Sequence, residues 1–249
     1  MKTLETPSAD ATAHTQTQTY TPTRWFGTGR SVDGDARVAG AQAACAALQG
    51  RQASLVIIFC PASIDLATML EGVRAESGDV PMIGCSGTTQ IEGTNPIEAA
   101  VVVNALGGEG FEIHTSVATD ITGKQRAAGE LIAGPIERLS SENKLLLLLC
   151  DGLTGDQHEI LRGAYGVVGA AVPIVGGCAA DDLAYSKTFQ FYSDADGDHV
   201  VTDAVVAAAI GSDTPIGIGV AHGWRKVGEP MMVTSSDGGR VRTLDGMPA

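Results

Sequence analysis

Basic and aromatic residues are both scarce in this 249-residue chain, and each shortage excludes something. Lys and Arg total 16 against 29 Asp and Glu, which gives a formal net charge of −13. Nucleic acids and anionic membrane surfaces are bound through clusters of basic side chains, so neither is an expected partner. Aromatic residues make up 4% of a chain that is 44% hydrophobic, so the core must be built from Ala, Val, Leu and Ile.

Long apolar runs and paired cysteines are also missing. No run approaches the roughly 20 apolar residues that span a bilayer, and the N-terminus lacks the basic-then-apolar pattern of a signal peptide. The five cysteines are odd in number, and no Cys-x-x-Cys pair occurs. This usage predicts reduced thiols in a cytoplasmic protein. The cysteines are Cys45, Cys60, Cys85, Cys150 and Cys178.

Familiar catalytic motifs do not occur in the context that they require. The sequence holds no phosphate-binding loop and no His-Glu-x-x-His pair, and its Gly-Thr-Gly at 27–29 precedes any clear strand. Residues 84–88 miss the nucleophile elbow Gly-x-Ser-x-Gly because Thr88 replaces the last glycine. We therefore expect no cofactor and no enzyme. The alternative is a hydrolase with Cys85 as nucleophile, or a metal-dependent enzyme with three carboxylates around Mg²⁺: Asp151, Asp181 and Asp182.

The hydrophobic pattern appears twice along the chain. Residues 1–23 are rich in Thr, Gln and Ala without an apolar period, which predicts a disordered tail. The runs 55–60 and 145–150 are apolar on both faces and predict buried strands. A helical pattern follows each run, and then a second strand that ends in a Gly-rich turn. We interpret the repetition as two pseudo-repeats, at about 50–140 and 141–236.

The repeated units predict an α/β (mixed α+β) fold. Each half would form a sheet with its own helices on one face, and the other face is also apolar and must be buried. Two mixed sheets packed face to face, with helices outside, satisfy both halves. One mixed sheet covered by helices on both sides is the alternative. No linker rich in Gly, Pro or Ser divides the halves, so residues 24–249 are treated as one domain.

Two clusters place polar side chains directly after apolar runs. Asp151 and Gly152 follow 145–150, and polar residues beyond strand carboxyl ends face ligand crevices in α/β proteins; alternatively, Asp151 caps a turn. His222, Gly223 and Trp224 follow the apolar run 216–221. Trp supplies a flat apolar wall with an N–H donor, and His a titratable edge. A buried structural Trp is the alternative here.

A third cluster combines glycines with acids. Gly176 and Gly177 let a backbone approach a ligand closely. Asp181 and Asp182 could accept hydrogen bonds from an ammonium group or hold a cation. Adjacent residues of an extended chain point to opposite sides, so only one of these two would face a given pocket. The alternative is a tight turn with solvated acids.

In these segments the chain resembles the N-terminal domain of the FIST family (F-box and intracellular signal transduction). The matches occur in family order from about residue 30 to the end, beginning with an apolar strand before Pro61. The later ones are Ile-Gly-Cys-Ser at 83–86, Leu-Cys-Asp-Gly-Leu at 149–153, Val-Gly-Gly-x-Ala-x-Asp-Asp at 175–182, Ala-His-Gly-Trp at 221–224 and Leu-Asp-Gly-x-Pro-Ala at 244–249.

The resemblance implies a cytoplasmic sensory domain of a prokaryotic signalling protein. It implies a small-molecule ligand such as an amino acid, a signalling output domain or protein as partner, and no established catalytic residues. In the family, 244–249 leads into a C-terminal domain that is absent from this chain. The expected binding residues are the three clusters above, with Cys85 and Ser86 at the equivalent turn of the first repeat. A protein-interaction module without a small ligand is a further alternative.

Overall fold

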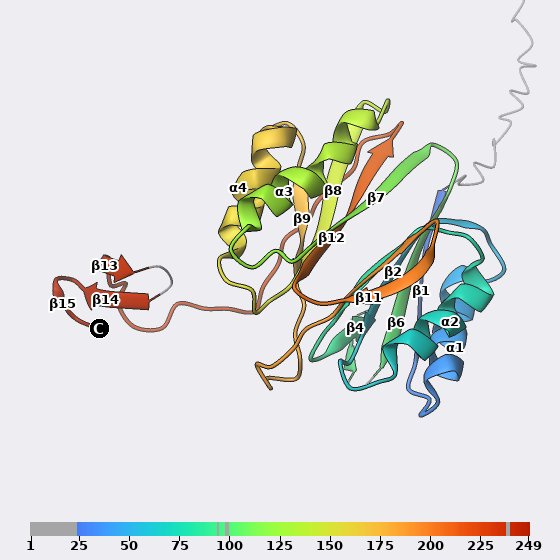
Figure 1. Ribbon diagram of the computed structural model, residues 1–249, viewed down its shortest axis with the longest axis horizontal. Coiled ribbons are helices and arrows are strands. Elements are labelled where there is room, and N and C mark those ends of the chain that lie inside the picture. The colour runs from blue at the N-terminus through green and yellow to red at the C-terminus, as the bar shows by residue number, and fades with distance from the viewer. Residues whose placement is uncertain (1–23, 94, 98–99, 238–239) are drawn as a thin grey trace, which may run out of the picture.

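Two stacked sheets, each covered on its outer face by helices, form the body of the protein (Figure 1). The computed structural model describes residues 24–249 apart from 94, 98–99 and 238–239, so the predicted tail lies outside the described residues. The mixed α/β fold with helix–sheet–sheet–helix layers is confirmed. No helix within the described ranges is long and apolar enough to cross a membrane.

The first sheet has the order β1-β6-β2-β3-β10-β11, and two helices cover its outer face. Strands β2 and β3 are parallel, and the other neighbours are antiparallel. The strands are β1 (Arg24–Ser31), β6 (Val101–Gly108), β2 (Ala53–Cys60), β3 (Met82–Ser86), β10 (Gln190–Asp194) and β11 (Gly197–Val201). The helices are α1 (Ala36–Leu48) and α2 (Leu66–Ser77).

The second sheet has the order β7-β12-β8-β9, with β8 and β9 parallel. Two α-helices and a short 3₁₀ helix cover its outer face. The strands are β7 (Phe111–Thr119), β12 (Ala204–Ser212), β8 (Asn143–Cys150) and β9 (Ile174–Cys178). The helices are α3 (Gln125–Ala133), α4 (Gln157–Val168) and η1 (Gly134–Arg138).

The two halves share one topology. In each half, a strand–helix–strand–helix–strand unit is followed by further strands. The last of these strands, β6 or β12, inserts between the first and second strands of its half. The order β1-β6-β2-β3 therefore matches β7-β12-β8-β9. This shared topology begins at β1 and β7, earlier than the boundaries near 50 and 141 expected from the apolar runs. The matching order supports an internal duplication, which stays a prediction.

In both halves a glycine allows the two helices to approach each other closely. A Cβ on Gly72 of α2 would collide with the carbonyl oxygen of Arg37 in α1. A Cβ on Gly163 of α4 would collide in the same way with the carbonyl oxygen of Arg126 in α3. Each helix pair therefore packs backbone against backbone, at a crossing that only glycine permits.

Three apolar clusters account for the burial of both faces of the central strands. Two lie between a sheet and its helices, and a third fills the space between the two sheets. In β8, Leu146 and Leu148 face the helices while Leu145 and Leu149 face the other sheet. This alternation follows from the two-residue period of a strand, and it explains why the run is apolar throughout.

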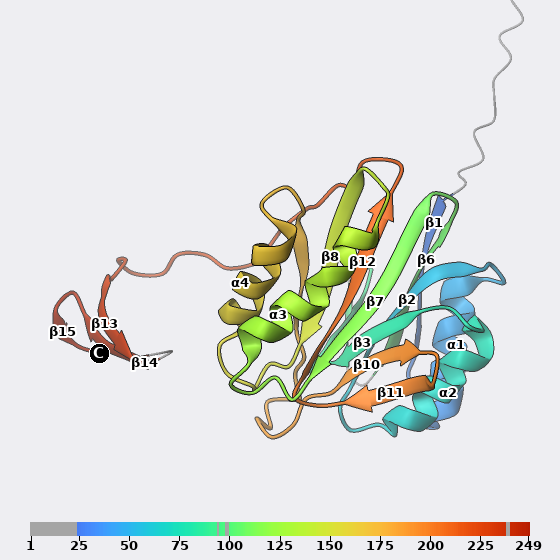
Figure 2. The ribbon, with the colours of Figure 1, turned by 45° about the horizontal axis from the view of Figure 1, so that its top comes forward.

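In the described part of the chain, two smaller sheets form no strand pairs with the main sheets, although β4 (Gln90–Glu92) packs beside β1 and β6. The hairpin of β4 and β5 (Asn95–Ile97) follows β3. The C-terminal strands β13 (Val233–Asp237), β14 (Arg240–Leu244) and β15 (Met247–Pro248) form a separate sheet. Figures 1 and 2 show this sheet beyond the stacked sheets, at the end of an extended segment, 213–232.

Candidate functional site

The carboxyl ends of β3, β8 and β9 meet at one edge of the sheet stack. The Ser86 hydroxyl donates to the Ala180 carbonyl at 2.8 Å, and the Ala180 N–H donates to the Ser86 carbonyl at 3.0 Å. A Cβ on Gly152 would collide with the Ala179 carbonyl oxygen. The structure thus brings the predicted clusters around Ser86, Asp151 and Gly176–Asp181 into one neighbourhood.

The predicted cluster of His222, Gly223 and Trp224 lies elsewhere. His222, Gly223 and Trp224 are exposed residues of the extended segment 213–232, and Trp224 is 86% exposed. The Trp224 N–H donates to His222 Nδ1 at 3.2 Å, within the segment itself. These three residues lie away from the other predicted site residues. Trp224 is neither a pocket wall nor a buried core residue in this structure, so neither interpretation of it fits its position.

Asp151 uses both carboxylate oxygens to hold backbone. It is buried, and it accepts hydrogen bonds from the Leu153 N–H at 2.7 Å and the Asp203 N–H at 3.0 Å. Buried acceptors are stable when such donors reach them. The carboxylate therefore fixes the turn after β8 against the chain that enters β12, as in the turn-capping alternative.

Asp181 organises the loop that follows β9. Its carboxylate accepts from the backbone N–H groups of Tyr185, Ser186 and Lys187, at 3.0, 2.6 and 2.9 Å. These bonds, led by those from Ser186 and Lys187, lower the pKa of the carboxyl below its usual value. Asp181 is buried, whereas Asp182 is exposed and has a left-handed φ of 55°. The two adjacent acids thus differ sharply in burial.

Neither Cys85 nor Ser86 offers an accessible nucleophile. Cys85 is buried between the sheets, and burial, with a smaller contribution from Cys178, raises its pKa to about 12. Ser86 is fully buried, donates to Ala180 and accepts from the Phe189 N–H at 3.1 Å. Across the ranges that the structure describes, no group of three or more His, Cys, Asp or Glu is placed to hold a metal ion.

An apolar pocket opens between α4, the carboxyl-terminal half of β8 and the whole of β9. Its volume is about 220 Å³. Two predicted residues, Gly176 and Gly177, form part of its wall, and no charged side chain lines it. The lining consists of Leu148, Cys150, Gln157, Leu161, Ile174, Val175, Gly176, Gly177 and Cys178. This space accepts an apolar group about the size of one large side chain.

Two neighbouring thiols line this pocket. Cys150 and Cys178 are directly paired on β8 and β9, with their Sγ atoms 3.4 Å apart. The hydrogen bond from the Cys150 thiol lowers the pKa of exposed Cys178, and the same contact together with burial raises the pKa of Cys150. Cys178 was not among the site residues predicted from the sequence. The available signal was that both cysteines end parallel strands, whose carboxyl ends lie together.

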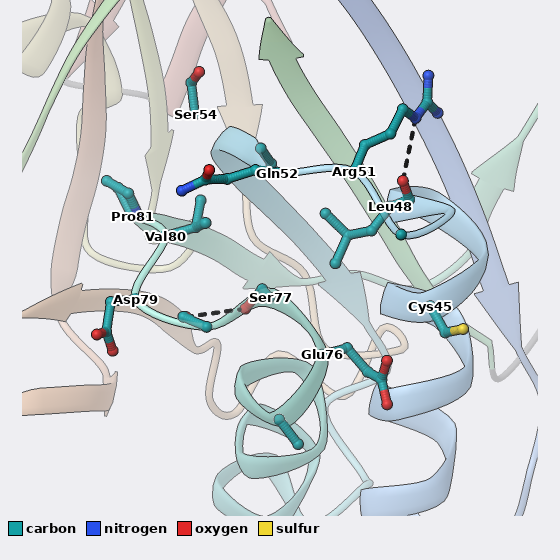
Figure 3. Close-up of a pocket in the computed structure, with 14 residues that line it drawn as sticks. Cys45, Leu48, Arg51, Gln52, Ser54, Glu76, Ser77, Asp79, Val80 and Pro81 are labelled. Atoms are coloured by element: carbon teal, nitrogen blue, oxygen red, sulfur yellow. Dashed lines mark hydrogen bonds between the residues drawn. The ribbon is translucent and has the colours of Figure 1, made fainter.

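A larger hollow of about 800 Å³ lies at the opposite, amino ends of β2 and β3 (Figure 3). Its charged side chains, Arg51, Glu76 and Asp79, stand apart around the rim. Arg51 Nε donates to the Leu48 carbonyl at 3.2 Å and so ties down the end of α1. No predicted site residue lies here, and binding sites place a few polar groups so that they converge, so we do not assign a ligand to it.

Comparison with known proteins identifies related sequences. The model of the FIST N domain family matches residues 54–247. An uncharacterized protein of Methanocaldococcus jannaschii is 36% identical over 110 residues, which are 43% of this chain and 20% of that protein, so the match spans about a fifth of the relative's length. A crystal structure of a cyanuric acid hydrolase from A. caulinodans aligns with a TM-score of 0.36 and 12% identity, covering 77% of this chain and 72% of the other. A likeness this weak carries no functional argument.

Proposed function

Because this chain belongs to the FIST N domain family, whose members are sensory domains of signal-transduction proteins, we propose that it binds a small molecule and reports its presence. We propose an amino acid as the ligand class and a prokaryotic, cytoplasmic signalling protein as the setting. The partner is a signalling output domain or protein. A sensor of this kind acts by binding one of two arrangements more tightly than the other.

The observation that carries the proposal is the apolar pocket beside Gly176 and Gly177. Ligand pockets are concave and mostly apolar, and they commonly lie at strand carboxyl ends. At about 220 Å³ this pocket is smaller than a typical drug-sized site, so it suits an amino-acid side chain. Gly176 has a φ of 149°, and a Cβ there would collide with the Leu148 carbonyl oxygen. The wall of the pocket therefore needs glycine.

Polar groups at the rim fit the charged end of an amino acid. The Gln157 side chain lines the pocket and donates its amide N–H to the Asp151 carbonyl at 3.2 Å, which leaves the amide oxygen to accept from an ammonium group. The Ala179 N–H bonds to Cys150 of β8. Successive N–H groups of a strand point to opposite sides, so those of Gly176 and Cys178 point away from β8, off the edge of the sheet. There a carboxylate could accept hydrogen bonds from them.

The acids shape this site and do not contact the ligand in our proposal. The carboxylates of Asp151 and Asp181 already accept hydrogen bonds from backbone N–H groups. The hydrolase and metal-enzyme alternatives therefore gain no support from these residues or from buried Cys85.

A protein-interaction role is a second candidate, and the C-terminal segment, residues 213–249, favours it. Several large apolar side chains of this segment are exposed, and clustered exposed apolar groups mark interaction sites. They are Val220, Trp224, Val227, Met231, Met232 and Met247. Binding of a partner protein that is lost in Trp224→Ala, without any small-ligand effect, would favour this second function.

A thermal-shift screen with amino acids tests the ligand proposal. At about 100 times its Kd a ligand stabilises by about 2.7 kcal/mol, and about 2–4 °C per kcal/mol applies to a domain of this size. Leu161→Trp should fill the pocket and abolish the shift, whereas Leu131→Trp, at a position 57% exposed on α3, should keep it. A shift that survives Leu161→Trp, or no shift across the panel on a folded chain, contradicts the proposal.

A further inference from the structure

One edge of the second sheet is open where the first sheet is closed. In the first half, β3 pairs with β10, so the sheet continues to β11 (Figure 2). In the second half, β9 holds the place of β3, and no described strand pairs with its outer side. The opposite edges, β1 and β7, are equivalent and end both sheets alike. An unpaired row of backbone N–H and C=O groups is a template for another strand.

The chain also carries a hairpin that closes no sheet. A hairpin follows β3, namely β4–β5, and another follows β9, namely β10–β11. Each begins with a buried glutamine, Gln90 or Gln190, whose side-chain oxygen has no hydrogen-bond partner among the described residues. The β10–β11 hairpin extends the first sheet, whereas β4–β5 pairs only with itself. The two hairpins therefore occupy the same place in the repeated topology, but only one of them extends a main sheet. Strand β4 packs beside β1 and β6 of its own half, where Glu92 pairs with Arg30 at 3.1 Å, and leaves Ile91 exposed.

The docked hairpin shows how the contact is made. Gln190 lies opposite Cys85, and Phe191 lies opposite Gly84. Phe191 is fully buried and belongs to the cluster beneath α2 that includes Ile58. A Cβ on Gly84 would lie 2.8 Å from the Phe191 ring. The second residue of the hairpin is thus an apolar anchor, and the glycine of the edge strand makes room for it.

The apolar pocket of the second half is the counterpart of the Phe191 position. Gly176 pairs with Leu148 of β8 as Gly84 pairs with Ile58 of β2, and a Cβ on either glycine would collide with its partner's carbonyl oxygen. The pocket beside Gly176 is lined by Leu148 and lies under α4, as Phe191 lies under α2. The pocket has the position and size to receive an anchor side chain.

We propose that the β4–β5 hairpin of a second copy of this chain pairs with the open edge of β9 and inserts Ile91 into the pocket. Ile91 is the second residue of β4, in the place of Phe191, and it is 67% exposed. The register of the docked hairpin puts Gln90 opposite Gly177 and Ile91 opposite Gly176. The contact adds a strand to an exposed sheet edge, with main-chain bonds for affinity and one pocket for specificity.

Two different surfaces meet in this contact, so each chain offers one hairpin and one edge. Reciprocal exchange closes a dimer, and head-to-tail exchange closes a larger ring. This contact between chains does not require the proposed ligand. If both hold, a small molecule and Ile91 are alternative occupants of one pocket.

Sedimentation velocity over a wide concentration range tests the assembly. The parent chain should assemble as its concentration rises, and Ile91→Asp should weaken the assembly constant by about ten- to a hundred-fold, as expected when a buried aliphatic anchor is lost. Leu131→Asp, which places the same charge at another exposed leucine, should assemble like the parent. A parent chain that stays monomeric at every concentration, or equal assembly by Ile91→Asp and parent, overturns the proposal.

Disulfide trapping tests the register independently. Thr89 precedes Gln90 as Phe189 precedes Gln190, and the Ser86 N–H donates to the Phe189 carbonyl. Ser86 corresponds to Cys178, so Thr89→Cys should form a disulfide with native Cys178 of another chain. Mixed ¹⁵N-labelled and unlabelled protein should yield crosslinked peptides of both isotopic origins, and Cys178→Ser should abolish them. Crosslinks confined to one chain, or their absence in an assembled sample, overturn the proposal.

Discussion

Replacement of Gly163 by alanine should destabilise the protein, although alanine is the better helix former. Gly163 lies in α4, where a Cβ would collide with the Arg126 carbonyl oxygen of α3. A backbone atom cannot rotate away, so the helices must separate, and such overpacking costs about 3 kcal/mol. The gain in helix propensity is about 1 kcal/mol. We therefore expect a net loss of about 2 kcal/mol.

Gly166, one turn further along α4, is the matched control. A Cβ there meets nothing within 4 Å, so Gly166→Ala should stabilise the protein by about 0.5–1 kcal/mol. Urea unfolding followed by circular dichroism gives both free energies of unfolding. The midpoint of thermal unfolding should fall by about 4–8 °C for Gly163→Ala and rise by about 1–4 °C for Gly166→Ala. Equal or greater stability of Gly163→Ala would refute the close contact between α3 and α4.

Two predictions concern titratable groups at the site. Cys178 should be alkylated by iodoacetamide with a pH midpoint below the 8.5 or so of a free thiol, because the Cys150 hydrogen bond lowers its pKa; Cys150→Ala should raise that midpoint, and an unchanged one in peptide mass spectrometry would contradict the pairing. The lowered pKa of Asp181 means that its contribution to stability is present above the unfolded pKa of about 3.9 and is lost as pH falls through the lower, folded value. Asp181→Asn should therefore flatten the decline in unfolding free energy between about pH 5 and about pH 3, and an identical decline would argue against the loop contacts.

The layered fold followed from the sequence because its main signal is strong. A strand that is apolar at every position, such as β8, must be covered on both faces, and two such strands in one chain need two sheets and outer helices. The boundaries of the halves were less visible. Strand β1 contains Gly27 and Gly29, whose missing side chains admit the backbone of α1, so its pattern does not look like an apolar strand. Apolar matching therefore found the middle of each half and missed its start.

The site was predictable where strand ends determine it and unpredictable elsewhere. Asp151 follows β8, and Gly176 lies in the neighbouring parallel strand β9, so their meeting at one edge could be expected. The hydrogen bonds from backbone N–H groups to Asp151 and Asp181 could not be predicted from the sequence, because they depend on loop geometry. The side chain of Trp224 is of a type that often forms a pocket wall. The segment around it is exposed and lies away from the stacked sheets, which no local sequence pattern predicts.

The difference between the halves bears more directly on function than their likeness does. Gly84 and Gly176 serve the same backbone contact in the two sheets, yet Gly84 is covered by Phe191 whereas Gly176 lies beside an apolar pocket. A buried aromatic ring completes the first site as part of folding. The second site leaves a similar apolar surface uncovered. Removing apolar surface from water lowers the free energy, so covering this site would be favourable. This uncovered surface is therefore where the proposed ligand, or the proposed second chain, would bind and change the state of the domain.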